Sequence, residues 1–394
     1  MRKVVITHAR RTPIGEFLGS FSNVTAVALG VVAAKGVLAE SKLDPKLVDE
    51  VIFGQARQAG SRPNPGRQIA FFSGIPYETP AYTVNKACGS GLKSIIHGYQ
   101  AIVLGDADII IAGGTENMTL VPFMLDKARL GYRIGHAKLL DGMYHDGLLC
   151  PLSNLVMGET AENLAVKYKI SREEQDEYAM TSQHKCEAAV KQDKFKDEIV
   201  PVEIKDGKKS ILIEKDEHPR SGVTMESLAK LPTVFKKKEE GGTVTPANAC
   251  GITDGAAAVL MMSEEKAKEL GYQPMAYVGA YATAGVDPAY MGIAPVPAIQ
   301  KLLKKTGLKL ADFDLIELNE AFAVQVIADN RELHLDLDKV NVNGGAIALG
   351  HPIGCTGARI VVTLLHEMVR RDAKNGLATL CMSGGMGMVV NFTR

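Results

Sequence analysis

The 394-residue sequence contains no tryptophan, and aromatic residues make up only 6% of it. It also lacks an excess of either charge, because 45 lysines and arginines balance 45 aspartates and glutamates. Overall neutrality argues against nucleic acid or an anionic membrane surface as the main partner, although it allows one basic pocket for a phosphorylated ligand. No apolar run is long enough to cross a bilayer, so we expect no membrane association.

Metal-binding and disulfide patterns are missing as well. No two cysteines form a C-x-x-C pair, so we expect free thiols, no metal site and a reducing cytoplasm. The first residues, Met1–Thr7, are typical of a strand rather than of a signal peptide, which agrees with a cytoplasmic location. The six scattered cysteines are Cys88, Cys150, Cys186, Cys250, Cys355 and Cys381.

Aliphatic residues and glycine are abundant: 46% of the chain is apolar, and 39 residues are glycine. The length exceeds what one ordinary core requires, so two or three domains are expected. Short apolar runs alternate with helix-length segments, a rhythm that predicts an α/β protein with a mostly parallel sheet. The predicted strands are Val4–Thr7, Val51–Gly54, Tyr82–Asn85 and Asp108–Ala112, and the predicted helices are Val24–Glu40 and Gly91–Leu104.

The last third of the chain repeats this rhythm. Lys309–Glu320 resembles Lys42–Gln55, and Leu377–Gly385 resembles Asp108–Gly114. The similarity is either accidental between two α/β segments or the trace of one architecture that was duplicated. Between the two parts, Val121–Val244 breaks the rhythm.

This middle segment contains one clear helix signal. Ser171 and Glu174 form a capping box that predicts the start of a helix running to Lys191. Long insertions of this kind are usually functional, and we expect the segment to cover one end of the sheets.

Cys88 is the first candidate for chemistry, because it lies between a predicted strand and a helix that begins with glycines. The positive end of the helix dipole favours a thiolate there. The small neighbours Gly89, Ser90 and Gly91 give a substrate access and leave backbone N–H groups free. The alternative is a buried cysteine at a close-packed turn.

Three other residues have both a catalytic and a structural interpretation. Pro352 keeps His351 extended, so His351 is either a general base for a thiol or a hydrogen-bonded turn histidine. Asn319 either donates to a developing oxyanion or caps the helix that follows. Cys381, flanked by glycines, is either a proton donor and acceptor or a core cysteine.

The placement of these four residues is more informative than any one of them. Cys88, Asn319 and Cys381 each follow a predicted strand, and His351 lies in the loop after a further one, Val340–Asn343. Ligand sites gather at the carboxyl ends of parallel strands. If the two halves face each other, Cys88 from one half meets the other three residues in one pocket.

At these residues the chain resembles the thiolase family. Cys-Gly-Ser-Gly at 88–91, Asn-Glu-Ala-Phe at 319–322 and Gly-His-Pro-Ile-Gly at 350–354 occur in the family's order and spacing, and the resemblance covers essentially the whole chain. It implies two similar βαβαβαββ halves in a layered α-β-α-β-α arrangement plus a loop domain. The halves would be residues 1–120 and 271–394, with the loop domain at 121–248 and the rest of the first sheet at 249–270. It also implies a homo-oligomer, a dimer or a tetramer.

The resemblance implies a role for each site residue. Cys88 would be the acylated nucleophile, His351 its base, and Cys381 the group that moves the proton at the α-carbon of acetyl-CoA. Asn319 would hold a water that forms one oxyanion hole with His351, and the N–H groups of Cys88 and Ser383 would form the other. Coenzyme A thioesters would be the substrates, with no metal or other cofactor. The side chains expected to contact them are Arg220, Ser227, Phe235, Met157, Met291, Phe322 and Cys250.

Four positions depart from the family pattern. Ser383 stands where glycine is usual, which preserves the N–H unless the residue needs a positive φ. Val156 stands where members with small substrates often have histidine. Pro246 and Cys250 belong to a segment that usually reads Ala-Gly-Asn-Ala-Ser, and a thiol makes a weaker hydrogen bond than the serine hydroxyl.

The expected activity is that of an acetyl-CoA C-acetyltransferase, which joins two acetyl-CoA molecules reversibly into acetoacetyl-CoA and coenzyme A. The first alternative is a 3-ketoacyl-CoA thiolase of fatty-acid β-oxidation with longer substrates. Alternatives of another kind are a non-catalytic acyl-CoA or lipid carrier and a cysteine hydrolase.

Overall fold

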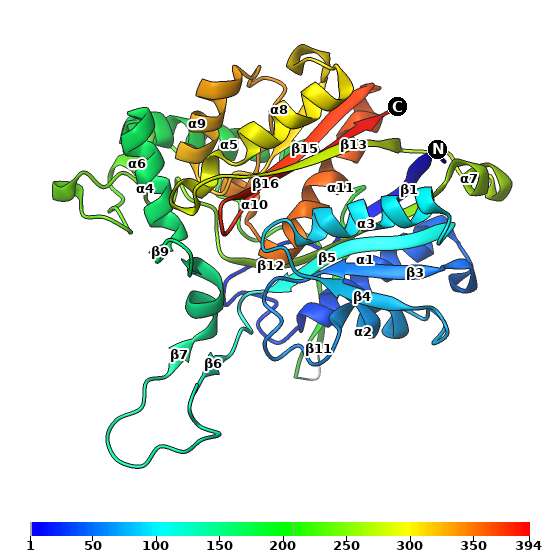
Figure 1. Cartoon of the computed structure of the whole chain (residues 1–394), viewed down its shortest axis with the longest axis horizontal. Helices are drawn as coiled ribbons and strands as arrows, with labels where there is room; N and C mark the ends of the chain where they lie inside the picture. The colour runs from blue at the N-terminus through cyan, green and yellow to red at the C-terminus, as the bar shows by residue number, and fades with distance from the viewer. Residues whose placement is uncertain (1, 208) are drawn as a thin grey trace.

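The computed structural model describes residues 2–207 and 209–394, and its centre is one mixed β-sheet (Figure 1). Neighbouring strands follow the order β14-β15-β16-β13-β1-β12-β5-β3-β4, and the short β2 pairs with β12. The strands are β1 (Val4–Arg11), β2 (Gly15–Glu16), β3 (Glu50–Gly54), β4 (Ala81–Val84), β5 (Ile109–Asn117), β12 (Thr253–Ser263), β13 (Ala276–Gly285), β14 (Leu315–Leu318), β15 (Asn375–Met382) and β16 (Met386–Thr393).

Helices cover and separate the two parts of this sheet. They are α1 (Ala26–Ser41), α2 (Pro65–Phe72), α3 (Ser90–Leu104), α4 (Met157–Tyr168), α5 (Arg172–Lys191), α6 (Met225–Ala229), α7 (Glu264–Leu270), α8 (Pro295–Thr306), α9 (Ala323–Leu333), α10 (Ala346–Leu349) and α11 (Ile353–Arg371). No helix in the described part of the chain is long and apolar enough to span a membrane.

The two halves of the sheet have the same topology. In the first half β3 runs parallel to β5, which is antiparallel to β12, which is antiparallel to β1. In the second half β14, β15, β16 and β13 repeat these relations in the same order. Both sequence echoes fall on equivalent strands, β3 with β14 and β5 with β15. This agreement favours duplication over accidental similarity.

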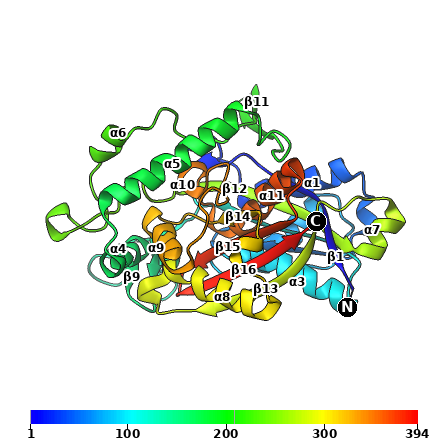
Figure 2. The ribbon, with the colours of Figure 1, turned by 90° about the horizontal axis from the view of Figure 1, so that it is seen from above.

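The layers follow from which helices contact which half. Helices α1 and α2 pack on the outer face of the first half, and α8 covers β13 and β16 on the outer face of the second. Helices α3 and α11 lie against each other between the two halves, as Figure 1 shows. The predicted α-β-α-β-α layering is therefore confirmed, and the view from above in Figure 2 shows α5 and α6 lying outside it.

The prediction of a mostly parallel sheet was wrong. Only β3 with β4, β3 with β5 and β14 with β15 are parallel, and the other pairs of the main sheet are antiparallel. Strand direction depends on the connections: β15 and β16 are joined by a tight turn in which Gly384 and Gly385 have φ values of 85° and 76°. A left-handed turn of this kind suits glycine and returns the chain antiparallel.

Local signals predicted most element positions to within a few residues. The Ser171–Glu174 capping box is present, with Ser171 Oγ accepting from Glu174 N at 3.1 Å, and α5 follows it to Lys191. The strand expected at Val340–Asn343 is reduced to one parallel bridge between Val340 and Ile316, because the next residues turn towards α10.

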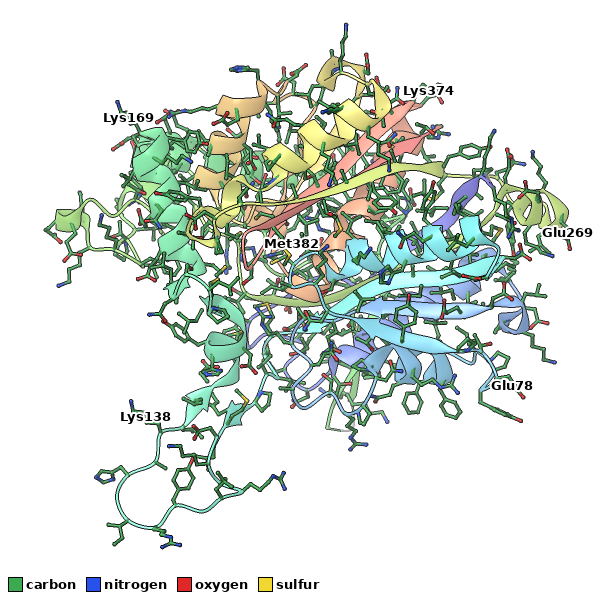
Figure 3. All side chains as sticks on the ribbon, viewed as in Figure 1. Glu78, Lys138, Lys169, Glu269, Lys374 and Met382 are labelled. Carbon is green, nitrogen blue, oxygen red and sulfur yellow. The ribbon has the colours of Figure 1, made fainter. Side chains whose placement is uncertain are left out.

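The middle segment extends away from the layers. It begins with an arm in which β6 (Phe123–Met124) pairs with β7 (Leu140–Asp141), and Figure 3 shows the arm's Lys138 far from the interior Met382. It continues through two more short hairpins, β8 (Leu149–Cys150) with β9 (Leu155–Val156) and β10 (Val202–Asp206) with β11 (Lys209–Ile213). Helices α4 and α5 of this segment contact α9 of the second half.

Candidate active site

One cavity of about 800 Å³ opens where the two halves and the middle segment meet. Cys88 reaches it from the first half, and His351, Cys381 and Ser383 reach it from the second. Most of its other lining residues are apolar, among them Met157, Met291 and Phe322. Residues more than 260 positions apart in the sequence therefore share one cavity with mostly apolar walls.

Cys88 occupies a tight turn between β4 and α3. The turn is closed by Ser90, whose Oγ accepts from Lys86 N at 2.8 Å and donates to Ala87 O at 2.7 Å. A Cβ atom on Gly89 would overlap with Sδ of Met382, and one on Gly91 would lie 2.7 Å from Ala358 N on α11. These glycines let the nucleophile's turn approach the second half.

The expected thiolate at Cys88 is not the resting form. Burial raises the pKa of the Cys88 thiol, and Arg57 and the backbone N–H groups of Ser383 and Cys88 oppose this shift without cancelling it. The loss of hydration raises the pKa by more than the positive end of the helix dipole lowers it. The thiol must therefore give its proton to a base before it reacts. Ser383 does not have a positive φ, and its N–H is available without strain.

His351 is positioned as that base. It lies between α10 and α11, and its Nδ1 is 2.6 Å from Thr356 Oγ1. Because the Thr356 hydroxyl donates to Pro352 O at 3.0 Å, it accepts from His351 Nδ1–H, which leaves the Nε2 lone pair free. Burial, followed by Arg359 and Arg57, lowers the pKa of His351 to about 3. The imidazole is therefore neutral near pH 7.

Cys381 belongs to the strand instead of the loop after it, since β15 continues to Met382. Its side chain is buried, and burial, followed by the nearby Cys88, raises its pKa well above the usual value. Burial and Cys88 also raise the pKa of Cys250 to about 12. Three protonated thiols thus share the cavity, and no three His, Cys, Asp or Glu side chains in the described residues are arranged to hold a metal ion.

Asn319 follows β14 but does not cap the next helix, because α9 begins at Ala323 with Phe322 in the N-cap position. Its amide is 1% exposed, and neither of its polar atoms has a hydrogen-bond partner among the described residues. A buried amide with free donor and acceptor sites is a suitable partner for an ordered water. Asn319 does not itself line the cavity.

Comparison with known proteins identifies the family. The sequence matches the family model of the thiolase N-terminal domain over residues 4–265 and that of the thiolase C-terminal domain over residues 272–394. This chain belongs to the thiolase family.

Several thiolases are similar to this chain over its full length. The acetyl-CoA acetyltransferases of Pseudomonas aeruginosa and Cupriavidus necator are 53% and 51% identical to it, each over 100% of both chains. The crystal structure of the Bacillus anthracis acetyl-CoA acetyltransferase superposes with a TM-score of 0.97 at 45% identity, covering 100% of this chain and 99% of the other. Human mitochondrial 3-ketoacyl-CoA thiolase, solved also in complex with CoA, gives 0.95 at 45% identity over 100% and 98%.

The thiolase residues predicted to contact coenzyme A line the same cavity. Phe235 and Phe322 meet edge to face with their ring centroids 6.4 Å apart. Arg220 is more exposed than these residues and forms an ion pair with Glu16 near the surface. The cavity wall includes Arg220, Ser227, Phe235, Met157, Met291, Phe322 and Cys250, together with the unusual Val156 and Pro246.

Sequence reasoning missed two buried carboxylates that hold this thiolase site together. Glu116, at the end of β5, accepts from Ala56 N at 3.0 Å and Gly354 N at 2.8 Å, and so joins the Cys88 side to the His351 side. Burial raises the pKa of Glu116 to about 6. Glu320 accepts from Ser182 Oγ at 2.7 Å and Ile347 N at 3.1 Å. Glu320 belongs to the Asn-Glu-Ala-Phe motif, but no role was predicted for its side chain, and Glu116 stands in no local pattern that distinguishes it from a surface residue.

Proposed function

We propose that this thiolase is an acetyl-CoA C-acetyltransferase that catalyses the reversible condensation of two acetyl-CoA molecules through an acyl-cysteine at Cys88. The observation that carries the proposal is the single cavity that Cys88, His351 and Cys381 line, in which His351 is neutral and has a free Nε2. Full-length similarity to acetyl-CoA acetyltransferases supports it.

In the proposed first half-reaction, His351 Nε2 takes the Cys88 proton as the sulfur attacks the thioester carbon of acetyl-CoA. The backbone N–H groups of Cys88 and Ser383 donate hydrogen bonds to the Cys88 sulfur. They are therefore positioned to stabilise the oxyanion that forms beside it. The leaving coenzyme A thiolate then takes the proton from His351. The acetyl group remains on Cys88 as a thioester.

In the second half-reaction, His351 Nε2 takes the thiol proton of Cys381, and the Cys381 thiolate removes a proton from the α-carbon of a second acetyl-CoA. The resulting enolate attacks the acetyl-cysteine, and the departing Cys88 thiolate takes the proton back from His351. A water held by the unpartnered Asn319 amide, together with His351, would stabilise the enolate oxygen. In the reverse direction, thiolysis, Cys381 donates the proton, which suits a thiol whose pKa is raised.

The apolar residues in the cavity wall favour a second candidate function, a 3-ketoacyl-CoA thiolase with longer acyl substrates. Val156, Met157 and Met291 offer no polar group to an acyl chain, and the human 3-ketoacyl-CoA thiolase is also structurally similar. Rates across a series of 3-ketoacyl-CoA chain lengths separate the two. A profile that stays flat or rises beyond six carbons rejects the short-chain assignment.

The decisive experiment is thiolysis of acetoacetyl-CoA with coenzyme A, combined with intact-mass detection of the acetylated enzyme. Cys88→Ala should lower kcat by about 10⁴-fold or more and abolish the mass increase. Full activity in Cys88→Ala refutes the mechanism. Free acid as the product, independent of coenzyme A, indicates a hydrolase, and binding without turnover indicates a carrier.

We further propose a cytoplasmic homo-oligomer in which residues 121–248 bind coenzyme A and contact neighbouring subunits. The arm between β6 and β7 exposes Leu130 and Ile134 almost completely and Leu139 by more than half. Apolar side chains on a projecting segment favour burial against another chain. Light scattering during gel filtration distinguishes a dimer from a tetramer, and a monomeric mass refutes assembly.

A further inference from the structure

Arg57 is a cavity residue that the proposed mechanism does not use. It follows β3, and its backbone N–H donates to Glu116 Oε1 at 3.1 Å, next to the turn that carries Cys88. Its side chain is 7% exposed and lines the cavity with Cys88. The preceding residue, Ala56, packs in the same small cluster as Cys88. Arg57 therefore brings a positive charge to the closed end of the site.

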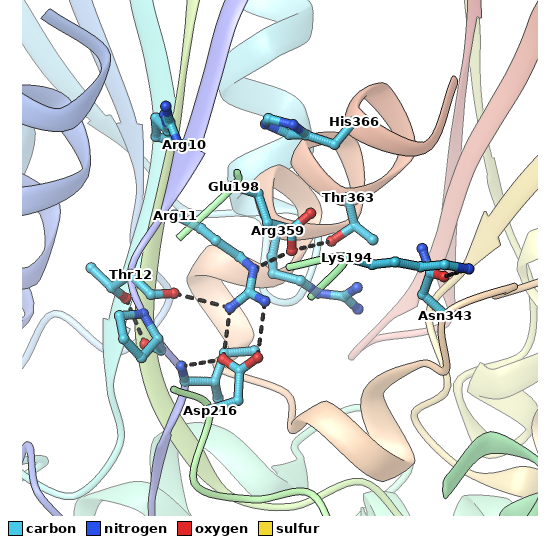
Figure 4. A network of polar contacts seen from close by, with 12 residues as sticks. Arg10, Arg11, Thr12, Lys194, Glu198, Asp216, Asn343, Arg359, Thr363 and His366 are labelled. Carbon is cyan, nitrogen blue, oxygen red and sulfur yellow. Dashed lines mark hydrogen bonds and ion pairs between the residues drawn. The ribbon is translucent and has the colours of Figure 1, made fainter. Parts of the chain in front are cut away.

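This guanidinium has no carboxylate partner, unlike the two other deeply buried arginines. Arg11 pairs with Glu198 at 2.5 Å and with Asp216 at 2.7 Å, as Figure 4 shows. Arg359 pairs with Glu317 at 3.3 Å. In the described residues Arg57 forms no ion pair, and its Nε has no hydrogen-bond partner. A buried cation without a partner is costly, so such a residue is kept where a ligand supplies the anion.

Arg57 is close enough to Glu116 to lower the pKa of that carboxyl, but no ion pair joins the two side chains in the described residues. Glu116, the nearest acidic group in the site, is committed to the backbone N–H groups of Ala56, Arg57 and Gly354. On the other side the guanidinium lies directly against Gly147, where a Cβ atom would overlap with Nε. The cavity wall near it includes the apolar Met118, Leu148 and Ile353. The guanidinium of Arg57 is thus available to a molecule in the cavity.

The position of Arg57 decides which part of a substrate can reach it. Arg220, near the surface, is the arginine expected to meet the nucleotide of coenzyme A, whereas Arg57 lies at the buried end beside the nucleophile. Apart from the transient Cys88 thiolate, a negative charge that a bound thioester brings to this end belongs to its acyl group. Arginine binds a carboxylate through paired N–H donors, and an apolar surrounding strengthens the interaction.

We propose that Arg57 binds the terminal carboxylate of an acyl group on Cys88, so that the enzyme also acts on coenzyme A thioesters of dicarboxylic acids. This inference rests on the proposed acyl-cysteine mechanism and names an additional substrate class for it. In thiolysis of a 3-oxo-dicarboxylyl-CoA, the C2–C3 bond breaks, C3 becomes the acyl carbon on Cys88, and C2 is protonated to give acetyl-CoA. Coenzyme A then releases the carboxyacyl group as its thioester, without any oxidant or reductant.

The test compares two substrates of equal chain length, the coenzyme A thioesters of 3-oxohexanedioic acid and 3-oxohexanoic acid. The wild-type enzyme should favour the first in kcat/KM, and Arg57→Met should lower the ratio of the two kcat/KM values by about 30-fold or more. Arg57→Lys should recover part of the ratio because it restores the charge without the paired donors. Arg62→Met, an exposed position in the same loop, is the matched control and should leave the ratio unchanged.

Alkylation of Cys88 gives a second readout that does not depend on substrate supply. Iodoacetate carries a carboxylate and iodoacetamide does not, so the ratio of their inactivation rates reports an anion site and cancels changes in thiol reactivity. Arg57→Met should lower this ratio by about 10-fold. The proposal is overturned if both substrates, or both reagents, lose rate equally in Arg57→Met, since Arg57 would then act on the Cys88 thiolate alone.

A wild-type preference for the uncharged substrate also overturns it. Failure of the underlying function is recognised separately, because the wild-type enzyme would then not cleave acetoacetyl-CoA either.

Discussion

Replacing Thr356 by valine tests whether the His351 tautomer controls catalysis. The substitution keeps the shape of the side chain but removes the hydroxyl that accepts from His351 Nδ1–H at 2.6 Å. Both residues are buried, so the Nδ1–H would lose its partner and water cannot easily replace it. An unsatisfied buried donor costs about 1–3 kcal/mol. The imidazole can avoid this cost by moving its proton to Nε2, which turns the base into a donor.

Since 1.4 kcal/mol corresponds to a factor of ten, Thr356→Val should lower kcat/KM for acetoacetyl-CoA thiolysis by about 10–100-fold. The rate of Cys88 alkylation by iodoacetamide at neutral pH should fall by a similar factor, because His351 no longer accepts the thiol proton. Both are measured between pH 6 and pH 9. Because the pKa of His351 is about 3, neither rate should show an acid limb near pH 6.5 that belongs to this histidine.

The matched control is Thr363→Val on the same helix. Thr363 Oγ1 donates to Glu198 Oε1 at 3.1 Å and is equally buried, but it lies about two helical turns beyond Thr356. Thr363→Val should lower the free energy of unfolding without a comparable decrease in kcat/KM. The reasoning about the tautomer is refuted if Thr356→Val retains more than half of the wild-type kcat/KM. It is also refuted if Thr356→Val and Thr363→Val lower kcat/KM by the same factor.

Two further predictions concern the other buried groups. Cys381→Ala should lower the rate of thiolysis by about 10²–10⁴-fold while acetyl-CoA still acetylates Cys88, because only the proton transfer at the α-carbon is removed; equal loss of acetylation, seen by intact mass, would contradict this assignment. Burial raises the pKa of Glu116 from 4.5 to about 6, so the folded state holds this proton more tightly than the unfolded state. That contribution to stability is fully present below pH 4.5 and is lost as the pH rises through 6, by about 2 kcal/mol. Urea denaturation at pH 5 and pH 7.5 should therefore show a smaller pH dependence in Glu116→Gln than in the wild type, and identical dependence in both would rule this explanation out.

Local sequence determined much of the secondary structure and the list of reacting groups. The capping box at Ser171, the apolar runs of β3 and β5, and the motif residues Cys88 and His351 all carry short-range signals, because helix caps, strand periodicity and tight turns depend on neighbours in the chain. The repeated rhythm suggested two similar halves but left accidental similarity open, and the structure favours duplication.

Tertiary structure alone decided the strand directions, the protonation states of Cys88 and His351, and the absence of an ion pair at Arg57 among the described residues. The antiparallel strands β12, β1, β13 and β16 owe their direction to connections that pattern does not encode. The thiol state of Cys88 and the neutral His351 follow from burial, which many distant residues produce together. Arg57 and Glu116 look like ordinary polar residues in the sequence. Their importance arises because folding closes an apolar cavity around them, and electrostatic effects in such a cavity depend on three-dimensional distance and not on position along the chain.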